Sequence, residues 1–206
     1  ISVIPTCADE NQFNISKKKY WRNELNICHL GTIGTRYNID LTLKFYKLLN
    51  KHIKTKILFI NDKEKTFIKN NCEKYRINKM NYEIKSIKYY DVHNTINNFD
   101  FSVFFPKKGY FINGFFPTKI AESLLSGVPI ITSKINNDLD NRISKNNIGI
   151  QIDQINEENI IRIMDNINNF KKNNYKIKLR DYALKNLSLV FAKSKYDIIY
   201  NLLLEK

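Results

Sequence analysis

The chain has 206 residues and a mass of 24.4 kDa, which is enough for one domain or at most two small ones. Hydrophobic residues make up 43% of it, so the chain can build a full core, and disorder is excluded as its main state. No apolar run approaches the roughly 20 residues that a membrane-spanning helix needs, which excludes such a helix. The chain begins at Ile1 without a methionine, and we expect it to be a piece of a longer protein.

The formal net charge is +14, from 34 basic and 20 acidic residues. Such an excess indicates anionic partners, namely nucleic acid, a phosphate-bearing ligand or an acidic membrane surface. Composition offers a second explanation, because 31 Ile, 29 Asn and 28 Lys beside only 6 Arg is the bias of an A/T-rich genome. Phosphate-binding grooves usually favour arginine. Cys7, Cys28 and Cys72 have no paired spacing, which indicates a reduced, cytoplasmic chain.

Short apolar runs alternate with amphipathic stretches along the chain. In order, the pattern predicts a strand over residues 26–30, a helix over 41–52, a strand over 56–61, a helix over 63–75, strands over 82–87 and 101–105, a helix over 118–126, strands over 129–132 and 148–152, and helices over 157–170, 176–186 and 193–204. The strand runs are continuously apolar, which is typical of a sheet covered on both faces. We therefore predict an α/β fold, a Rossmann-like doubly wound parallel sheet of about six strands followed by C-terminal helices.

Four other expectations concern local structure. The polar stretch 168–178 is predicted to be a flexible loop, and the last helix, which contains Ile198, Ile199, Leu202 and Leu203, is interpreted as a core helix. Asp138 and Asp140 have the spacing of a metal-binding DxD, but we interpret them as helix-capping residues. The aromatic residues around Lys107 and Lys108 could stack on single-stranded nucleic acid, but we interpret them as a mobile loop beside a ligand site.

The first candidate binding loop follows the first predicted strand. In such a sheet the carboxyl ends of the strands open into a crevice toward which helix N-termini point. Gly31 and Gly34 let the backbone approach a ligand closely, and the free N–H groups of the helix that begins near Asn38 could hold a diphosphate. The loop is neither a GxGxxG nor a Walker motif, and a plain strand-to-helix turn explains it equally well.

The second candidate is the helix that begins after Pro117, a residue that suits the first turn of a helix. The N–H groups of Thr118 and Lys119 are unpaired there and can bind an anion, and Lys119 adds a positive charge. Glu122 lies about one turn further on, where its carboxylate can accept two sugar hydroxyls. This arrangement fits a nucleoside diphosphate, with the alternative that Glu122 is a solvated helix residue.

The segment PTKIAESLLSGVPIITS, residues 117–133, resembles the nucleotide-sugar signature of the GT-B glycosyltransferases, specifically glycosyltransferase family 4. Residues 4–13 resemble the segment that re-enters the family's second domain. Residues 30–34 resemble its first strand and glycine turn, residues 91–106 the helix and strand before the signature, and residues 148–150 the strand after it. The resemblance covers nearly the whole chain in order.

The resemblance implies that residues 1–206 are a single donor-binding domain, the C-terminal half of a two-domain enzyme whose N-terminal, acceptor-binding domain is absent. The full-length enzyme would be a retaining hexosyltransferase that moves sugar from a nucleotide-diphosphate sugar to a polysaccharide or glycolipid, while the fragment alone would be inactive. It would be cytoplasmic, peripheral on the inner face of the membrane, with an anionic membrane surface as a further partner. Neither a metal, another cofactor nor nucleic acid is expected.

By the same resemblance Glu122 would hold the ribose. The N–H groups of Thr118 and Lys119, together with the turn from Gly31 to Gly34, would hold the diphosphate. The backbone from Ser86 to Lys88 would border the base, and Arg36 would substitute for the family's donor-phosphate residues.

The family often has a glutamate eight residues before the ribose glutamate, where this chain has Gly114. This departure leaves the sugar contacts and the choice between retention and inversion open. No catalytic residue is assigned. Two alternatives stay open: a basic nucleic-acid-binding α/β module, and a non-catalytic or epimerase relative of the GT-B fold.

Overall fold

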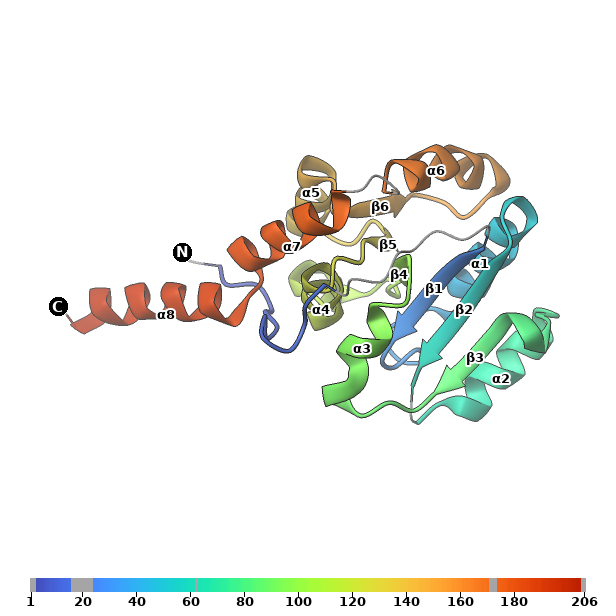
Figure 1. Ribbon diagram of the computed structural model, residues 1–206, viewed down its shortest axis with the longest axis horizontal. Helices are drawn as coiled ribbons and strands as arrows, with labels where there is room; N and C mark the ends of the chain where they lie inside the picture. Colours follow the sequence, from blue (N-terminus) through green and yellow to red (C-terminus); the bar gives the residue numbers. More distant parts are fainter. Residues whose placement is uncertain (1–2, 16–23, 62, 171–173, 205–206) are drawn as a thin grey trace.

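Six parallel strands form one sheet in the order β3-β2-β1-β4-β5-β6 (Figure 1). The computed structural model describes residues 3–15, 24–61, 63–170 and 174–204. Within these ranges the strands are β1 Leu25–Leu30, β2 Thr55–Ile60, β3 Tyr82–Lys85, β4 Phe101–Phe104, β5 Ile130–Ser133 and β6 Gly149–Ile152. The strand order reverses between β1 and β4, the pattern of a doubly wound sheet. The predicted fold class is therefore confirmed.

Helices cover both faces of this sheet. They are α1 Ile39–His52, α2 Lys65–Lys74, α3 Val92–Ile96, α4 Thr118–Leu125, α5 Asn137–Asn146, α6 Glu157–Asn169, α7 Tyr175–Asn186 and α8 Leu189–Leu204, with 3-10 turns at Lys79–Asn81, Tyr89–Asp91 and Tyr110–Gly114. Helix α1 contacts α2 and α6, while α4 contacts α7, so two separate helical layers form. The central strands are buried between these layers, which explains why their sequences are continuously apolar. None of the described helices is long and apolar enough to cross a membrane.

Helix α8 is not a core helix, and that prediction was wrong. None of its described residues is buried, and Ile198 and Leu203 are 54% and 62% exposed. Figure 1 shows α8 projecting away from the sheet. Near its start, the N–H of Leu189 donates to the carbonyl of Ala8 and to the carboxylate of Glu10. Its apolar residues follow a helical pattern that predicts burial, but the described chain provides no core for them.

The loop predicted over residues 168–178 falls partly outside the described residues, since 171–173 are not described. On either side of that gap the chain is helical, because α6 extends to Asn169 and α7 begins at Tyr175.

Candidate functional site

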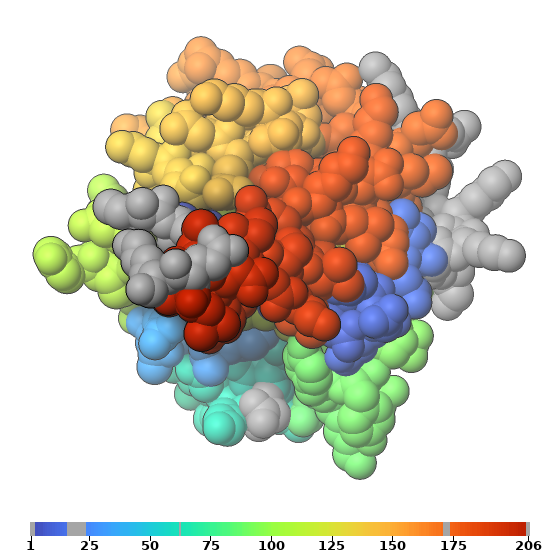
Figure 2. All heavy atoms as spheres, turned by 90° about the vertical axis from the view of Figure 1, so that its left-hand side faces the viewer, coloured from blue at the N-terminus to red at the C-terminus, as the bar shows by residue number. Residues whose placement is uncertain are grey.

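An open pocket with a volume of about 1010 Å³ lies at the carboxyl ends of the central strands. Its walls come from the loop after β1, from the ends of β2 and β3, and from the segment that leads into α4. This is the point at which the strand order reverses, where doubly wound sheets bind ligands. Figure 2 views the side toward which α8 (red) projects, and the chain after β1 (blue), after β3 (green) and after β4 (lime) reaches the surface there.

The N-terminus of α4 faces this pocket without a side-chain cap. Helices α1, α5 and α6 are each capped by an asparagine side chain, but Pro117 precedes α4 and offers no such group. Among the described residues, no acceptor is found for the N–H groups of Thr118 and Lys119, and both residues line the pocket. The positive end of α4 is therefore available to an anion.

The Lys119 side chain is buried, with only 8% of the residue exposed. Its ammonium donates a hydrogen bond to the carbonyl of Leu30 at the end of β1, and it lies 3.7 Å from the centroid of the Tyr37 ring. Burial lowers the pKa of Lys119 to about 7, although the neighbouring Glu122 carboxylate acts in the opposite direction. Near neutral pH the amine and ammonium forms therefore lie close in free energy.

Glu122 lies one turn along α4 from Lys119, and its residue is 9% exposed while lining the pocket. Burial raises the pKa of its carboxyl, while the Lys119 charge and a hydrogen bond with the Tyr89 side chain lower it. Glu122 is thus not a solvated helix residue, which excludes that alternative. Its carboxylate is a buried acceptor at the edge of an open cavity, the situation in which hydrogen bonds to hydroxyl groups are strongest.

The two glycines of the first loop have different surroundings. Gly31 has a φ of +79° and lines the pocket, where a Cβ in its place would lie 4.0 Å from Lys119 Nζ. Gly34 is not in the pocket wall, and its N–H donates to the carboxylate of Glu64 over 3.0 Å. At the start of α1, the Asn38 side chain caps the N–H of Leu41, and none of residues 38–41 lines the pocket. The first turn of α1 is therefore not placed at this pocket, contrary to expectation.

Of the predicted site residues, the structure brings seven together in this one pocket: Gly31, Arg36, Ser86, Lys88, Thr118, Lys119 and Glu122. Phe115 and Phe116, from the aromatic segment expected beside a ligand site, also line the pocket, while four other wall residues were missed by the sequence analysis: Thr6, Tyr37, Asn61 and Tyr89. Tyr37 directly follows Arg36, but nothing in the sequence indicates that its ring turns inward onto Lys119. The other missed residues come from segments far apart in the chain.

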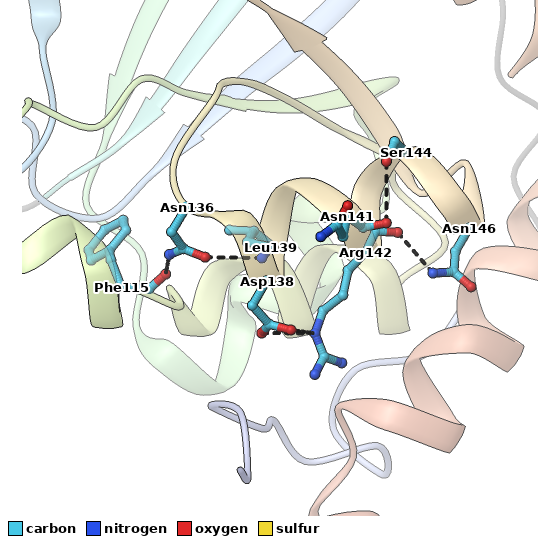
Figure 3. A network of polar contacts seen from close by, with 8 residues as sticks. All are labelled: Phe115, Asn136, Asp138, Leu139, Asn141, Arg142, Ser144 and Asn146. Atoms are coloured by element: carbon cyan, nitrogen blue, oxygen red, sulfur yellow. Dashed lines mark hydrogen bonds and ion pairs between the residues drawn. The ribbon is translucent and has the colours of Figure 1, made fainter.

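The wall segment before α4 is fastened to α5 by Asn136. Its amide nitrogen donates to the carbonyls of Ile112 and Phe115, over 2.9 and 3.0 Å, while its amide oxygen caps α5 at the N–H of Leu139 (Figure 3). One side chain therefore holds both the start of a helix and a wall of the pocket. The aromatic segment around Lys107 and Lys108 includes Tyr110, which is 95% exposed, and ends in this fastened wall.

The two aspartates of the DxD segment lie in α5, and each has a partner within the protein. Asp138 forms an ion pair with Arg142 (Figure 3), and Asp140 accepts hydrogen bonds from the N–H of Ile135 and the amide of Gln151. The residue that caps α5 is Asn136, and both aspartates lie in the first turn of the helix, so their interpretation as capping residues was wrong. In the described part of the chain, no group of three or more His, Cys, Asp or Glu residues is placed to hold a metal ion.

Comparison with known proteins identifies the family. Residues 11–186 match the family Glycosyl transferases group 1. No curated protein matches the chain in sequence. Among solved structures, the C-terminal domain of a glycosyl transferase group 1 protein (LpcC) from Francisella tularensis is 12% identical with a TM-score of 0.64, and the likeness covers 88% of this chain and 99% of that one.

Two larger proteins are also similar. WaaG, a glycosyltransferase involved in lipopolysaccharide biosynthesis, is 14% identical with a TM-score of 0.70, covering 96% of this chain and 56% of WaaG. HepE from Anabaena, crystallised with UDP and glucose, is 11% identical with a TM-score of 0.70, covering 97% of this chain and 56% of HepE. The chain thus spans about half the length of these two proteins. At such low identity the structural likeness establishes the fold, and the family match covers most of the sequence. The chain therefore belongs to the group 1 glycosyl transferases and has the fold of GT-B glycosyltransferase C-terminal domains.

Proposed function

We propose that this chain is the donor-binding half of a two-domain GT-B enzyme, which transfers a sugar from a nucleotide-diphosphate sugar to a polysaccharide or glycolipid. The N-terminal half of the enzyme would bind the acceptor at the cytoplasmic face of a membrane. One observation carries the proposal: the uncapped N-terminus of α4, Lys119 and Glu122 all line the same open pocket. The UDP and glucose bound by HepE support a ligand of this class.

The proposed assignments follow from the charges. The diphosphate lies against the N–H groups of Thr118 and Lys119 and the Lys119 ammonium, with Arg36 as a second cation. The ribose hydroxyls donate to Glu122, and the base lies near the backbone from Ser86 to Lys88. Catalysis is then positioning of the donor, with stabilisation of the departing diphosphate by the helix terminus and Lys119. No metal is needed for these steps, because the protein groups themselves supply positive charge.

Calorimetric titration of the chain with UDP, GDP and ADP tests this proposal. We expect one of the three to bind, and Glu122→Ala to weaken its binding about tenfold or more, because hydrogen bonds to a charged group contribute about 1.5–3 kcal/mol. The matched control is Glu158→Ala, which removes an equal charge from an exposed residue on α6 that does not line the pocket. The 2′,3′-dideoxy form of the same nucleotide should bind weakly to both the unmodified chain and Glu122→Ala.

Two outcomes would contradict the proposal. The first is that none of the three nucleotides binds the unmodified chain. The second concerns the alternative of a nucleic-acid-binding module. If duplex DNA binds tightly, with steep salt dependence, and neither Lys119→Ala nor Glu122→Ala alters the binding of any ligand, the +14 charge and not the pocket determines the function.

A further inference from the structure

The Glu64 side chain joins two strand ends beside the pocket. Glu64 immediately precedes α2, but its side chain does not cap that helix. Instead, one carboxylate oxygen accepts from the N–H of Ile33 over 2.8 Å, and the other accepts from the N–H of Gly34 over 3.0 Å. Both oxygens are therefore used to hold the turn after β1, the turn whose first residue, Gly31, borders the pocket.

Asn61 fixes this carboxylate from the end of β2. Its amide nitrogen donates to Glu64 over 2.7 Å and to the carbonyl of Gly31 over 3.1 Å. Its amide oxygen accepts from the N–H groups of Lys63 and Glu64. Asn61 is only 5% exposed, while Glu64 and Gly34 are half-buried. Each of these polar groups has a partner, and a network of this kind is rigid.

The surroundings of Glu64 favour a charged carboxylate in this place. Burial alone raises the pKa of its carboxyl, but the hydrogen bonds from Ile33, Asn61 and Gly34 outweigh that effect and lower the pKa. Gly34 also leaves room for the contact, because a Cβ there would lie 3.1 Å from the nearer carboxylate oxygen. On its other side, the carbonyl of Gly34 accepts from the Lys107 ammonium over 2.5 Å. Both backbone groups of Gly34 are thus held by charged side chains.

We propose that Glu64 is a positioning residue for donor binding, an inference that rests on the proposed function. Glu64 does not line the pocket, so it does not touch the ligand. It holds the turn in the shape that presents Gly31, Thr35 and Arg36 to the diphosphate, and it occupies two N–H groups that would otherwise lack a partner. Diphosphate affinity therefore depends on a carboxylate that carries the same sign of charge as the ligand.

The test is Glu64→Gln, compared with Glu73→Gln, an equal change at an exposed position of the same helix. The ligands are whichever of UDP, GDP and ADP binds the unmodified chain most tightly, and its monophosphate. We expect the affinity of Glu64→Gln for the diphosphate to fall about tenfold, the loss of roughly one hydrogen bond to a charged group. The monophosphate should lose less. Amide hydrogen exchange at Ile33 and Gly34 should accelerate, while Glu73→Gln should match the unmodified chain in each measurement.

Gly34→Ala disturbs the same contact, because the added methyl group crowds the Glu64 carboxylate. It should also weaken diphosphate binding more than monophosphate binding, so the test does not depend on the folding of a single variant. An unchanged diphosphate affinity in Glu64→Gln would overturn the inference. So would an equal loss for the two ligands, which indicates general destabilisation, or tighter diphosphate binding, which indicates that the carboxylate competes with the ligand. If the unmodified chain binds no nucleotide, the proposed function fails first and the inference fails with it.

Discussion

The Lys119 ammonium lies 3.7 Å from the centroid of the Tyr37 ring, over its face. A cation over an aromatic face gains about 0.5–2 kcal/mol, with the larger values at desolvated sites. Tyr37 is itself held by edge contacts with His29 and Phe104 and by a tilted contact with Phe115. The ring therefore links the core, the wall before α4 and the Lys119 ammonium.

Replacement of Tyr37 by leucine should therefore affect both stability and binding. Tyr37→Leu removes the ring from a buried position and should lower the free energy of unfolding by about 2 kcal/mol, measured by urea denaturation. Nucleotide affinity should fall about tenfold, because Lys119 is then less well placed. Tyr37→Phe is the matched control, since it keeps the ring and should change both quantities little. Equal nucleotide affinities in the two variants would show that the ring does not position Lys119.

Nucleotide affinity should fall as pH rises above 7. Burial lowers the pKa of Lys119 to about 7, so the free protein loses this charge above that pH. A bound diphosphate favours the ammonium form, and binding should therefore take up a proton between pH 7 and 9. The affinity should fall by up to about tenfold per pH unit, the limit for one coupled proton. Calorimetry in buffers of different ionisation enthalpy counts that proton. Lys119→Met should bind the nucleotide more weakly at pH 7, and its affinity should not fall in this way as the pH rises. Identical pH profiles for the unmodified chain and Lys119→Met would contradict the assignment of the proton to Lys119.

The same pKa predicts the opposite trend for stability. The folded-state pKa of Lys119, about 7, lies below its value in the unfolded chain, about 10.4. The unfolded state therefore binds more protons between these values, and the free energy of unfolding should rise with pH from 7 to 9. Lys176, with a pKa lowered by burial to about 8, contributes in the same direction. The difference between the unmodified chain and Lys119→Met isolates Lys119, and a parallel pH dependence in the two proteins would count against it.

Features that depend on local sequence were predictable. All six strands were predicted to within two residues at each end. In β2, β4 and β5 the signal was an apolar run that is buried on both faces, whereas the edge strands β3 and β6 alternate along their length. Lys119 and Glu122 were found because a proline-started helix leaves its first N–H groups free and places residues one turn apart on the same side.

Features that depend on pairing between distant segments were not predictable. Glu64 meets Ile33 across 31 residues of sequence, only because β1 and β2 are neighbours in the sheet. Helix α5 was missed because it buries only two of its side chains, Leu139 and Ile143, so its apolar pattern is weak. Its ends are marked by polar residues instead, namely Asn136 as the N-terminal cap and Asn147 in a left-handed conformation at the C-terminus. The opposite error occurred at α8, where an apolar helical pattern has no described core beside it.

Gly149 and Gly114 differ in the space that an added methyl group would meet. Gly149 pairs with Ile130 between β5 and β6, and a Cβ there would overlap the carbonyl of Ile130 and lie 2.5 Å from its side chain. Because the β5 backbone is fixed by pairing on both edges, Gly149→Ala should lower the free energy of unfolding by about 1–3 kcal/mol, as overpacking does. Gly114 has no atom within 4 Å of such a Cβ, so Gly114→Ala should change stability by less than about 0.5 kcal/mol. Urea denaturation of the two variants measures both values. Equal stabilities of the two variants would mean that β6 can shift against β5 to make room for the methyl group. In that case β6 would not be a fixed support for α5, which holds the pocket wall at Phe115 through Asn136.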